Sequence, residues 1–525
     1  MIALALAACG GGSNNDNPGG GGDSGKPVMG GTLKYALEGN TTNFCIPRAQ
    51  LAISGILVVE SMYDTLARPT QDPNVFAPYL AKSITPNADY TEWTIEIRDG
   101  VKFHDGTALT AEVVKQNIDA WKAGILLSFV FGNIDSTTVS GNSVIVKMKV
   151  PWVAFPGFLW ATGRAGIAAP SQLESADCDT KLVGTGPFKL KTFDPTSGNV
   201  SVTKNANYWR TGFPYLDGID FIVQQESSQR INGLEGGQFD IIPSSGGLDL
   251  ADVKELTGIT IQEEAEGRQE ISHVLLNVER PPLNDLRARK AIAMGTDRDK
   301  LNAIANKGTG RYAYQVFDTE VVGYVENPGF PEYDIEAAKK LVDEVKADNN
   351  GEFEFDIQST FDQTTQAIFA EAKRQLGLIG ITVNLPTPVD QSTIINMAIG
   401  GQVDSFGWRN YPGQDPDSLF VWFKGGSVVN FNHVNDPIMN QTLDAGRSEP
   451  DADKRKALYE TFNKRMSSQV YNLWTWYTAW FVAHDTTVQG ISGPNLPNEA
   501  GAVGTEKPVD LLAGYHQLLG IWKTK

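Results

Sequence analysis

The sequence has few of the residues that most often carry out chemistry in proteins. Only five histidines occur among 525 residues, and they are isolated from one another: His104, His273, His433, His484 and His516. An enzyme, for example a secreted hydrolase, would need a nucleophile with a histidine partner or a set of spaced metal ligands. We therefore expect no catalytic residues, no metal site and no cofactor.

Positive charge and long apolar runs are also scarce. The chain has 44 Lys and Arg against 62 Asp and Glu, a formal net charge of −18, which repels a phosphate backbone and excludes nucleic acid as a partner. The sequence contains no run of about 18 apolar residues, so no membrane-spanning helix is expected. Because a single hydrophobic core stops growing at about 250–300 residues, a chain of 525 residues predicts two or three lobes.

Cysteine is rare too, and the first of the three cysteines has a special context. Cys9 follows Leu6-Ala7-Ala8, which resembles the lipobox of bacterial lipoproteins; the alternative is a chance alanine-rich start. Residues 1–9 then form the remnant of a signal peptide, and because its basic n-region is missing we expect the true start to lie upstream. Residues 10–27 are rich in Gly, Ser and Asn and predict a flexible tether.

A diacylglycerol on Cys9 would anchor the chain stably, because two acyl chains suffice where one is marginal. This predicts an extracytoplasmic protein that is lipid-anchored to the outer face of the cell membrane. In that oxidising place the two remaining cysteines, Cys45 and Cys178, are free to pair. A disulfide between them is a hypothesis that a free-thiol count tests.

The stretch DGVKFHDGTALTAEVV (residues 99–114) sets a histidine beside an aspartate between glycines, which suggests a catalytic dyad. However, Thr91–Phe103 alternates apolar and polar residues as a half-buried strand does. The letters HDG at 104–106 have the composition of a turn, and Thr110 has the position of a helix N-cap. We interpret the stretch as a turn between a strand and a helix.

Further along, helices and strands are expected to alternate, which is the pattern of an α/β fold. Arg287, Arg289 and Lys290 are expected to form a solvated helix face, and Asp415-Pro416 to begin a helix as N-cap and first residue. The expected elements are a helix at Ala52–Pro69, a strand, helix and strand within Ile219–Ile242, one amphipathic helix within Arg280–Ala305, helices at Glu336–Asp348 and Gln363–Gly377, strands at Phe353–Gln358 and Ile381–Leu385, and an aromatic strand at Val470–His484.

Six motifs resemble, in content and in order, the family 5 extracellular solute-binding proteins of ABC importers, which include dipeptide, oligopeptide and nickel receptors. The resemblance covers most of the chain after the tether. The motifs are IRDGVKFHDGTALTAEVV (Ile97–Val114), VGTGPFKL (Val183–Leu190), NANYWR (Asn205–Arg210), GLEGGQFDII (Gly233–Ile242), LNVERPPLNDLRARKAIAMGTDRDKL (Leu276–Leu301) and LGLIGITVNL (Leu376–Leu385).

The resemblance implies an α/β fold of the periplasmic-binding-protein type II kind, with two main lobes joined by a two-crossing hinge and an extra inserted lobe. The crossings are expected near Arg268 and Phe481. The expected division is residues 28–60, 184–267 and 482–525 for lobe I, 61–183 for lobe II and 268–481 for lobe III.

The resemblance also bears on the ligand. Peptide-binding members place an aspartate three residues after a tryptophan for the ligand's ammonium, and dipeptide receptors place an arginine after the strand that matches FEFDIQST for its carboxylate. Here Tyr411 stands three residues after Trp408, and Ser359–Phe361 occupy the second place. Both charged groups are absent, which argues against a dipeptide and favours a longer peptide, an oligosaccharide or an aromatic compound.

The candidate ligand-binding residues are Trp408, Arg409, Asn410, Tyr411, Trp476 and Tyr477. For each aromatic ring among them, core packing is an equally good interpretation. Arg409 would favour an anionic group on the ligand if its side chain faces the cleft.

The function that the resemblance implies is that of a substrate-binding lipoprotein of an ABC importer. Such a protein captures a peptide or another small organic solute in a cleft between lobes and delivers it unaltered to a membrane permease. The alternatives are a nickel, metallophore or oligosaccharide receptor of the same family, or a receptor that passes its ligand to a sensor. A monomer is expected.

Overall fold

The structure is a computed structural model of the chain. It describes residues 25–41, 43–47, 51, 53–72, 75–124, 127–411, 413, 415–478 and 480–524, and of Ser392 the backbone alone. The expected signal-peptide remnant, the lipidation site Cys9 and most of the expected tether lie outside the described residues. Within the described ranges, no helix combines the length and the apolar character that crossing a membrane requires.

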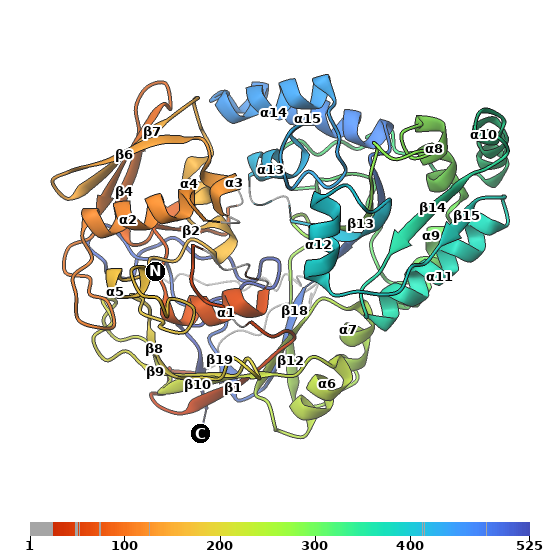
Figure 1. The fold of residues 1–525 in the computed structure, drawn as a ribbon. Coiled ribbons are helices and arrows are strands. Elements are labelled where there is room, and N and C mark those ends of the chain that lie inside the picture. The colour runs from red at the N-terminus through yellow and green to blue at the C-terminus, as the bar shows by residue number, and fades with distance from the viewer. Residues whose placement is uncertain are drawn as a thin grey trace, which may run out of the picture.

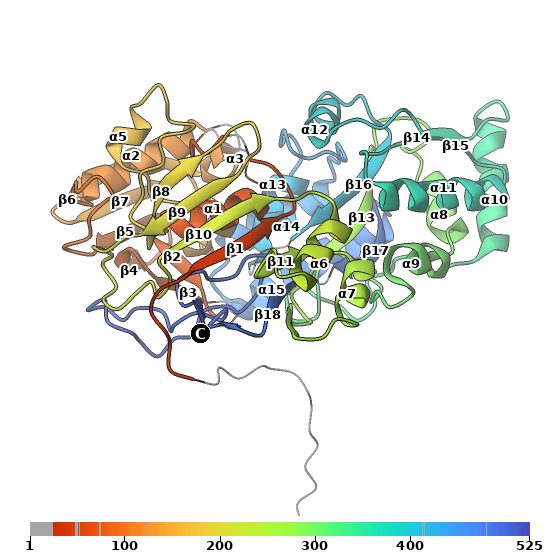
Figure 2. The ribbon, with the colours of Figure 1, turned by 90° about the horizontal axis from the view of Figure 1, so that it is seen from below.

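The largest sheet has seven strands in the order β12-β18-β11-β1-β10-β9-β8 (Figures 1 and 2). Strand β1 is parallel to both of its neighbours, and the other pairs are antiparallel. The strands are β1 (Thr32–Leu37), β8 (Phe188–Phe193), β9 (Val200–Lys204), β10 (Gly218–Val223), β11 (Ile241–Ser244), β12 (Ile259–Glu263) and β18 (Phe481–Asp485), and the connecting helices are α6 (Ser227–Glu235) and α7 (Gly247–Val253).

A second sheet has five strands in the order β15-β14-β16-β13-β17 and lies on the right of Figure 1. Its strands are β13 (Glu270–Leu276), β14 (Glu354–Gln358), β15 (Thr382–Asn384), β16 (Ser405–Asn410) and β17 (Asn472–Thr478). Its helices are α8 (Leu286–Gly295), α9 (Arg298–Asn306), α10 (Ile335–Asp348), α11 (Gln363–Gly377), α12 (Gln391–Ile399), η2 (Pro416–Leu419), α13 (Phe420–Phe423), α14 (Pro437–Ser448) and α15 (Ala452–Ser468).

A third sheet has four strands in the order β4-β5-β7-β6 and lies at the upper left of Figure 1. Its elements are β4 (Ala81–Pro86), β5 (Glu92–Ile97), β6 (Ile134–Ser140), β7 (Ser143–Met148), α2 (Ala111–Lys122), α3 (Leu127–Phe131), α4 (Phe155–Phe158) and α5 (Pro170–Leu173). The pairs β2 (Ala67–Pro69) with β3 (Phe76–Pro78) and β19 (Val488–Gln489) with β20 (Trp522–Lys523) complete the strands.

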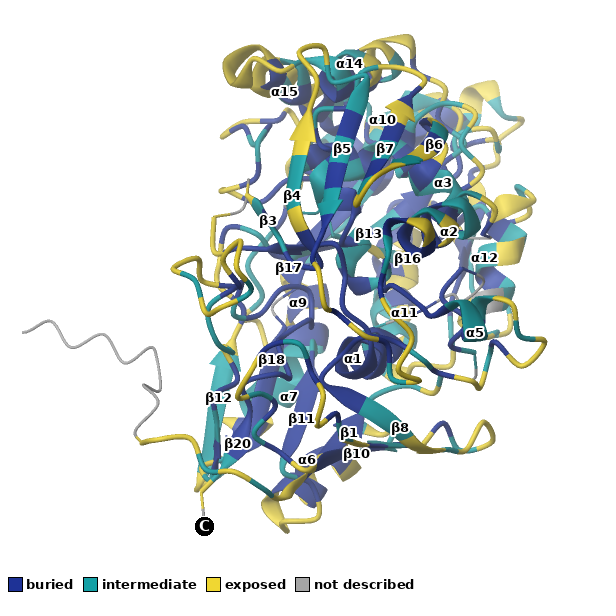
Figure 3. Ribbon diagram, turned by 90° about the vertical axis from the view of Figure 1, so that its left-hand side faces the viewer, coloured by how far each residue is buried: buried dark blue, intermediate teal, exposed yellow. Residues whose placement is uncertain are grey.

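The sheets form two bodies, each with its own hydrophobic packing. Helix α1 (Ile53–Met62) is apolar along most of its length and is buried (Figure 3), as expected of a helix without a polar face. One cluster joins Leu33 of β1, Leu57 of α1 and Ile95 of β5, so the seven- and four-stranded sheets share a core. We call them the first body. The five-stranded sheet packs in separate clusters and forms the second body.

The chain passes between the two bodies at two places. It leaves the seven-stranded sheet after β12, at Glu263, and enters the five-stranded sheet with β13, at Glu270. It returns between Thr478, the end of β17, and Phe481, the start of β18. The aromatic stretch 470–484, expected as one strand, is therefore two strands of different sheets. Its uniform apolar character fits burial in both bodies and conceals the crossing.

Two expected helices are also divided or shortened. Helix α1 ends at Met62, because the carbonyls of Asp64 and Thr65 accept hydrogen bonds from the backbone of distant segments. The helix expected within 280–305 is broken at Thr296, and Asp297 caps a new helix through the backbone N–H of Asp299. Arg289, expected on a solvated face, is buried and donates to backbone carbonyls.

Several helices and strands that were expected from local sequence patterns are confirmed. Thr110 is the N-cap of α2 and accepts from the Val113 N–H at 3.4 Å. Asp415 caps η2, whose first residue is Pro416. The helix, strand, helix and strand expected over 336–385 are α10, β14, α11 and β15.

The histidine turn at 104–106 serves the fold. His104 is part-buried against the turn that precedes β8: its backbone N–H donates to the Gly184 carbonyl at 2.9 Å, and its Nε2 lies 3.0 Å from the Gly186 carbonyl. A Cβ on Gly184 would lie 2.1 Å from the Met62 carbonyl oxygen, so only glycine allows this close approach. Burial lowers the pKa of His104 to about 4, and the imidazole is neutral at pH 7.

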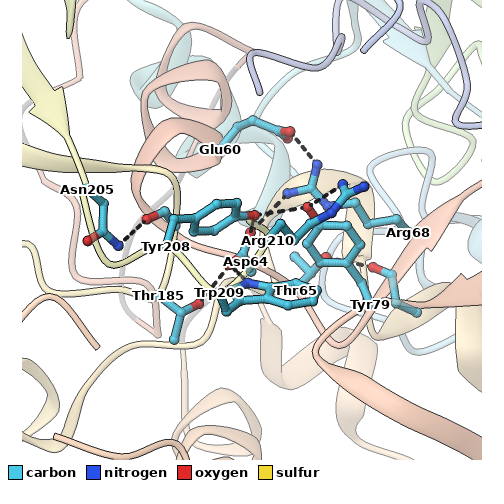
Figure 4. Close-up of polar contacts among 12 residues, drawn as sticks. Glu60, Asp64, Thr65, Arg68, Tyr79, Thr185, Asn205, Tyr208, Trp209 and Arg210 are labelled. Carbon is cyan, nitrogen blue, oxygen red and sulfur yellow. Dashed lines mark hydrogen bonds and ion pairs between the residues drawn. The ribbon is translucent and has the colours of Figure 1, made fainter. Parts of the chain in front are cut away.

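Two of the motifs meet in a buried polar network (Figure 4). Asp64, which follows α1, accepts from Thr185 at 3.1 Å, from Tyr208 at 3.1 Å and from Trp209 at 2.9 Å. Nearby, Arg68 donates to Glu60 at 2.5 Å. Burial raises the pKa of the Asp64 carboxyl, although Arg68 and the hydrogen bonds act in the opposite sense. The motifs VGTGPFKL and NANYWR therefore tie α1 to the sheet that it covers.

Candidate functional site

The two crossings bring charged and aromatic side chains of both bodies together. We call this set the junction cluster; it consists of Glu38, Glu264, Glu270, Arg409, Tyr411 and Trp480. Its members come from the end of β1, from both crossings, from the start of β13 and from the end of β16. Because both bodies contribute, the cluster is a place where a ligand could contact both of them at once.

Arg409 is the cation of the junction cluster. Its side chain is 41% exposed, its Nη1 donates to Ser245 Oγ at 2.7 Å, and it lies 3.7 Å from Glu270 Oε2. Its guanidinium also stands 5.3 Å from the centroid of the Trp480 ring. Arg409 belongs to the five-stranded sheet and Ser245 follows β11 of the seven-stranded sheet, so this hydrogen bond joins the two bodies.

Glu38 supplies a carboxylate close to the same place. Tyr35 of β1 is the parallel register partner of Ile241 of β11, so Glu38 and Ser244, three residues further along, end neighbouring strands. Glu38 is half-buried, and no hydrogen bond or ion pair joins its carboxylate to another residue that the structure describes. Burial raises the pKa of Glu38, and the charge of Arg409 acts in the opposite sense.

The crossings themselves are joined by Glu264, Glu270 and Trp480. The Trp480 indole Nε1 donates to Glu270 Oε2 at 2.8 Å, and the Trp480 N–H donates to Glu264 Oε2 at 3.3 Å. Glu264 Oε1 accepts from the Ala513 N–H at 2.6 Å. Burial raises the pKa of the Glu264 carboxyl well above its usual range. These contacts fix the start of β13 and β18 against one another.

Tyr411, one residue beyond β16, extends from the second body to the first. Its half-buried ring packs against the core that the seven- and four-stranded sheets share. Its buried hydroxyl has no hydrogen-bond partner within the described part of the chain. Burial raises the pKa of this hydroxyl well above its usual range. Tyr411 therefore serves as a contact between the two bodies, with its hydroxyl shielded from solvent.

Trp408 and Asn410, the other candidates on β16, have different surroundings. The half-buried Trp408 ring packs with Phe431 and Trp422, with centroids 5.4 and 6.0 Å away, and its indole N–H has no partner among the described residues. Asn410 is 3% exposed, and its Oδ1 lies 2.9 Å from His273 Nε2. Asn410 therefore serves the interior of the second body.

Trp476 and Tyr477 pack inside the second body. Trp476 is 9% exposed and lies among Leu301 of α9 and Ala372 of α11. The Tyr477 hydroxyl donates to the Phe317 carbonyl at 3.0 Å. Of the six candidates, Arg409 and Tyr411 lie in the junction cluster.

Sequence reasoning missed Glu38, Glu264, Glu270 and Trp480. A partial signal existed, since a charged Glu38 directly follows a buried strand, a common position for functional residues in α/β folds. Glu264 and Trp480 became neighbours only because the chain crosses twice between the sheets. The nearness of Glu38 to Ser245 and Arg409 likewise depends on the order of the strands.

The cluster is chemically suited to binding. An exposed guanidinium beside an aromatic ring can accept a carboxylate, and a half-buried carboxylate can accept an ammonium or amide group. Among the described residues, no group of three or more His, Cys, Asp or Glu side chains could hold a metal ion. Elsewhere, Cys45 and Cys178 are joined by a disulfide, as the sequence hypothesis proposed.

Comparisons with known proteins agree on one family. The family model of the bacterial extracellular solute-binding proteins, family 5 Middle, matches residues 75–431. The glutathione-binding protein GsiB of Escherichia coli K12 is 28% identical over 312 residues, which are 58% of this chain and 59% of that protein. The chain thus matches somewhat more than half the length of such curated relatives.

Solved structures with the same fold cover nearly the whole chain. The agropinic acid complex of AgaA from A. tumefaciens R10 has a TM-score of 0.80 at 25% identity, covering 94% of this chain and 99% of AgaA. The nonapeptide complex of AppA from Bacillus subtilis has a TM-score of 0.79 at 19% identity, covering 95% and 100%. The expected α/β, periplasmic-binding-protein type II-like fold is thereby confirmed.

Proposed function

Because the chain belongs to the family 5 bacterial extracellular solute-binding proteins, we propose that it is the substrate-binding protein of an ABC importer. It captures a solute between its two bodies outside the cytoplasm and delivers it, chemically unaltered, to a membrane permease. In this proposal the first body acts as the expected lobes I and II, the second body acts as lobe III, and the two crossings act as the hinge.

One observation above all supports this proposal: Arg409 of the second body bonds to Ser245 of the first, beside the half-buried Glu38. A ligand that contacts both bodies stabilises only the arrangement in which they are close, and so shifts the population toward the closed form. The size of that shift equals the difference in affinity between the two arrangements. A site shared by both bodies is therefore what capture by closure requires.

The charges of the site indicate the ligand class. Arg409 offers a guanidinium to a carboxylate, and Glu38 lies in the same cluster as an acceptor for an ammonium or amide group. We propose a small peptide or an amino-acid-derived compound that carries both kinds of group. Glutathione, named for the relatives, and agropinic acid, bound by AgaA, are the first probes to use.

The first residues of the sequence support a proposal about where the protein acts. We propose that Cys9 carries a lipid and that residues 10–27 tether the folded part to the outer face of the membrane. Labelling of cells with a radioactive fatty acid should mark the wild-type protein and leave a Cys9→Ala variant unlabelled. Label on the variant would refute the anchor without affecting the binding proposal.

A thermal-shift screen of the purified, lipid-free protein tests the binding function. The panel contains short peptides, glutathione, agropinic acid, oligosaccharides and nickel chelates. A specific ligand at a hundredfold excess over its Kd stabilises the folded state by about 2.7 kcal/mol, which is a shift of a few degrees. We expect peptides or amino-acid conjugates to give it; a shift with sugars or nickel chelates alone would contradict the proposed ligand class.

A further inference from the structure

The two bodies also touch at a second place, formed by the connection between β7 and α4. Trp152, in this connection, points its indole at the second body, where Nε1 donates to Asp417 Oδ2 at 2.7 Å. Arg447 of α14 holds the other side of the same carboxylate, with Nε 3.0 Å from Asp417 Oδ1. Trp152 and Asp417 are 0% exposed and Arg447 is 5% exposed. We call these three residues the remote contact.

Backbone groups complete the remote contact. The Val153 N–H donates to the Arg447 carbonyl at 3.1 Å, and Ser448 Oγ donates to the Pro151 carbonyl at 3.2 Å. The Arg447 guanidinium lies 5.1 Å from the centroid of the Trp152 ring. Polar groups of both bodies are thus paired with one another and shielded from water, which is the condition under which hydrogen bonds to a charged group are strongest.

The remote contact lies far from the crossings. Figure 1 shows α14 and α4 in the upper part of the molecule and β12 and β18, where the crossings join the first body, lower down. Any rotation of one body about the crossings moves distant groups most. Opening would therefore separate Trp152 from Asp417 while the Asp417–Arg447 ion pair, contained within the second body, stays intact.

We propose that the remote contact of Trp152, Asp417 and Arg447 holds the two bodies closed and thereby sets part of the ligand affinity without touching the ligand. These are positioning residues, and the inference rests on the proposed function. If losing the contact lowers the closed fraction of the unliganded protein, the apparent Kd rises by the same factor. A hydrogen bond from Trp152 to a buried carboxylate is strong enough for a change of about tenfold.

The test uses Trp152→Phe, which removes the indole N–H and keeps an aromatic ring. The control is Trp93→Phe: the Trp93 Nε1 donates to the Trp152 carbonyl at 3.2 Å, wholly within the first body. Spin labels at Lys147→Cys on β7 and Lys456→Cys on α15, both exposed positions, report the distance between the bodies. A Cys9→Ala background and the paired Cys45 and Cys178 leave no competing thiol.

We expect unliganded Trp152→Phe to shift population toward longer label distances and to bind glutathione, or whichever probe the screen identifies, about tenfold more weakly. Trp93→Phe should lower the melting temperature while leaving the distances and Kd unchanged. Ser448→Ala, which removes one part-buried hydrogen bond of the contact, should shift distances in the same direction by less, and is the second variant if Trp152→Phe folds poorly.

The outcomes separate the two proposals. Unchanged distances in both Trp152→Phe and Ser448→Ala, or equal shifts in Trp93→Phe, would overturn the role of the remote contact even if ligand binds. Longer distances without binding of any probe would support the contact and count against the proposed function.

Discussion

At the scale of single residues, the proposed site depends on an arginine whose guanidinium stays partly exposed beside the carboxylates of the junction cluster. Arg409 bonds to the neutral Ser245 Oγ and lies 3.7 Å from Glu270, whose Oε2 is also occupied by the Trp480 indole. Its guanidinium therefore keeps donors available. Sequence reasoning identified Arg409 and Tyr411 from their place after a tryptophan. It could not identify Glu38, because the neighbourhood of β1 and β11 is a property of the folded sheet.

Replacement of Arg409 tests the anion-binding role. Arg409→Ala should weaken binding of a carboxylate-bearing ligand by tenfold or more, because a charge-assisted hydrogen bond of about 1.5–3 kcal/mol is lost. Arg374→Ala is the matched control, since Arg374 is exposed on α11 and pairs with Glu371. Titration calorimetry measures both. Equal affinities of the two variants would place the ligand's anion elsewhere.

A second residue-scale prediction concerns His273 and pH. Burial lowers the pKa of His273 to about 3, although the hydrogen bond between its Nε2 and Asn410 acts in the opposite sense. The unfolded chain, with a histidine pKa of about 6.5, binds the proton more tightly than the folded one. His273 therefore stabilises the fold fully above pH 6.5, and this contribution falls as the pH drops toward 3, by about 1.4 kcal/mol per pH unit.

Urea unfolding at pH 7 and pH 4.5 checks this sign. His273→Gln should be less stable than wild type at pH 7 and should lose less stability on acidification. The buried carboxyls of Asp64 and Glu264, whose pKa values are raised, act in the opposite sense in both proteins, so the difference between the two isolates His273. A parallel pH dependence in variant and wild type would refute the assignment.

At the scale of helices and strands, the sequence predicts best those features that are set by residues close together in the chain. Thr110 and Asp415 begin helices because their own side chains cap the backbone, and such capping needs no distant partner. The end of α1 and the division of 470–484 between two sheets are set by segments far away in the chain. Periodicity of apolar residues cannot reveal a strand that changes sheets, because burial is the same on both sides.

The disulfide joins two connecting segments whose cysteines are 133 residues apart in the sequence. Cys45 lies in the segment between β1 and α1, and Cys178 follows α5. A loop of this length predicts a loss of about 2–5 kcal/mol when the bond is absent. Cys45→Ala, Cys178→Ala and the double variant should therefore be destabilised equally, as measured by urea unfolding. A double variant much less stable than either single one would show that the bond does not form.

At the scale of the whole molecule, function is proposed to follow from two bodies connected twice by short crossings. The junction cluster lies at the crossings and contains groups for the ligand, whereas the remote contact joins the two bodies at another place and needs no ligand. Contacts at both places thus favour the closed arrangement of the two bodies. The remote contact sets part of the equilibrium between the open and closed arrangements, and a solute of the right charge shifts it further toward the closed one. Delivery of an intact solute requires only this change of position.

The most direct test of the account measures the distance between labels at positions 147 and 456 in the wild-type background, with and without the ligand that the screen identifies. We predict a mixture of longer and shorter distances without ligand, collapse to the shorter distance at saturation, and recovery of the ligand with its mass unchanged. One unaltered distance distribution at full occupancy, or a chemically converted ligand, would contradict the account.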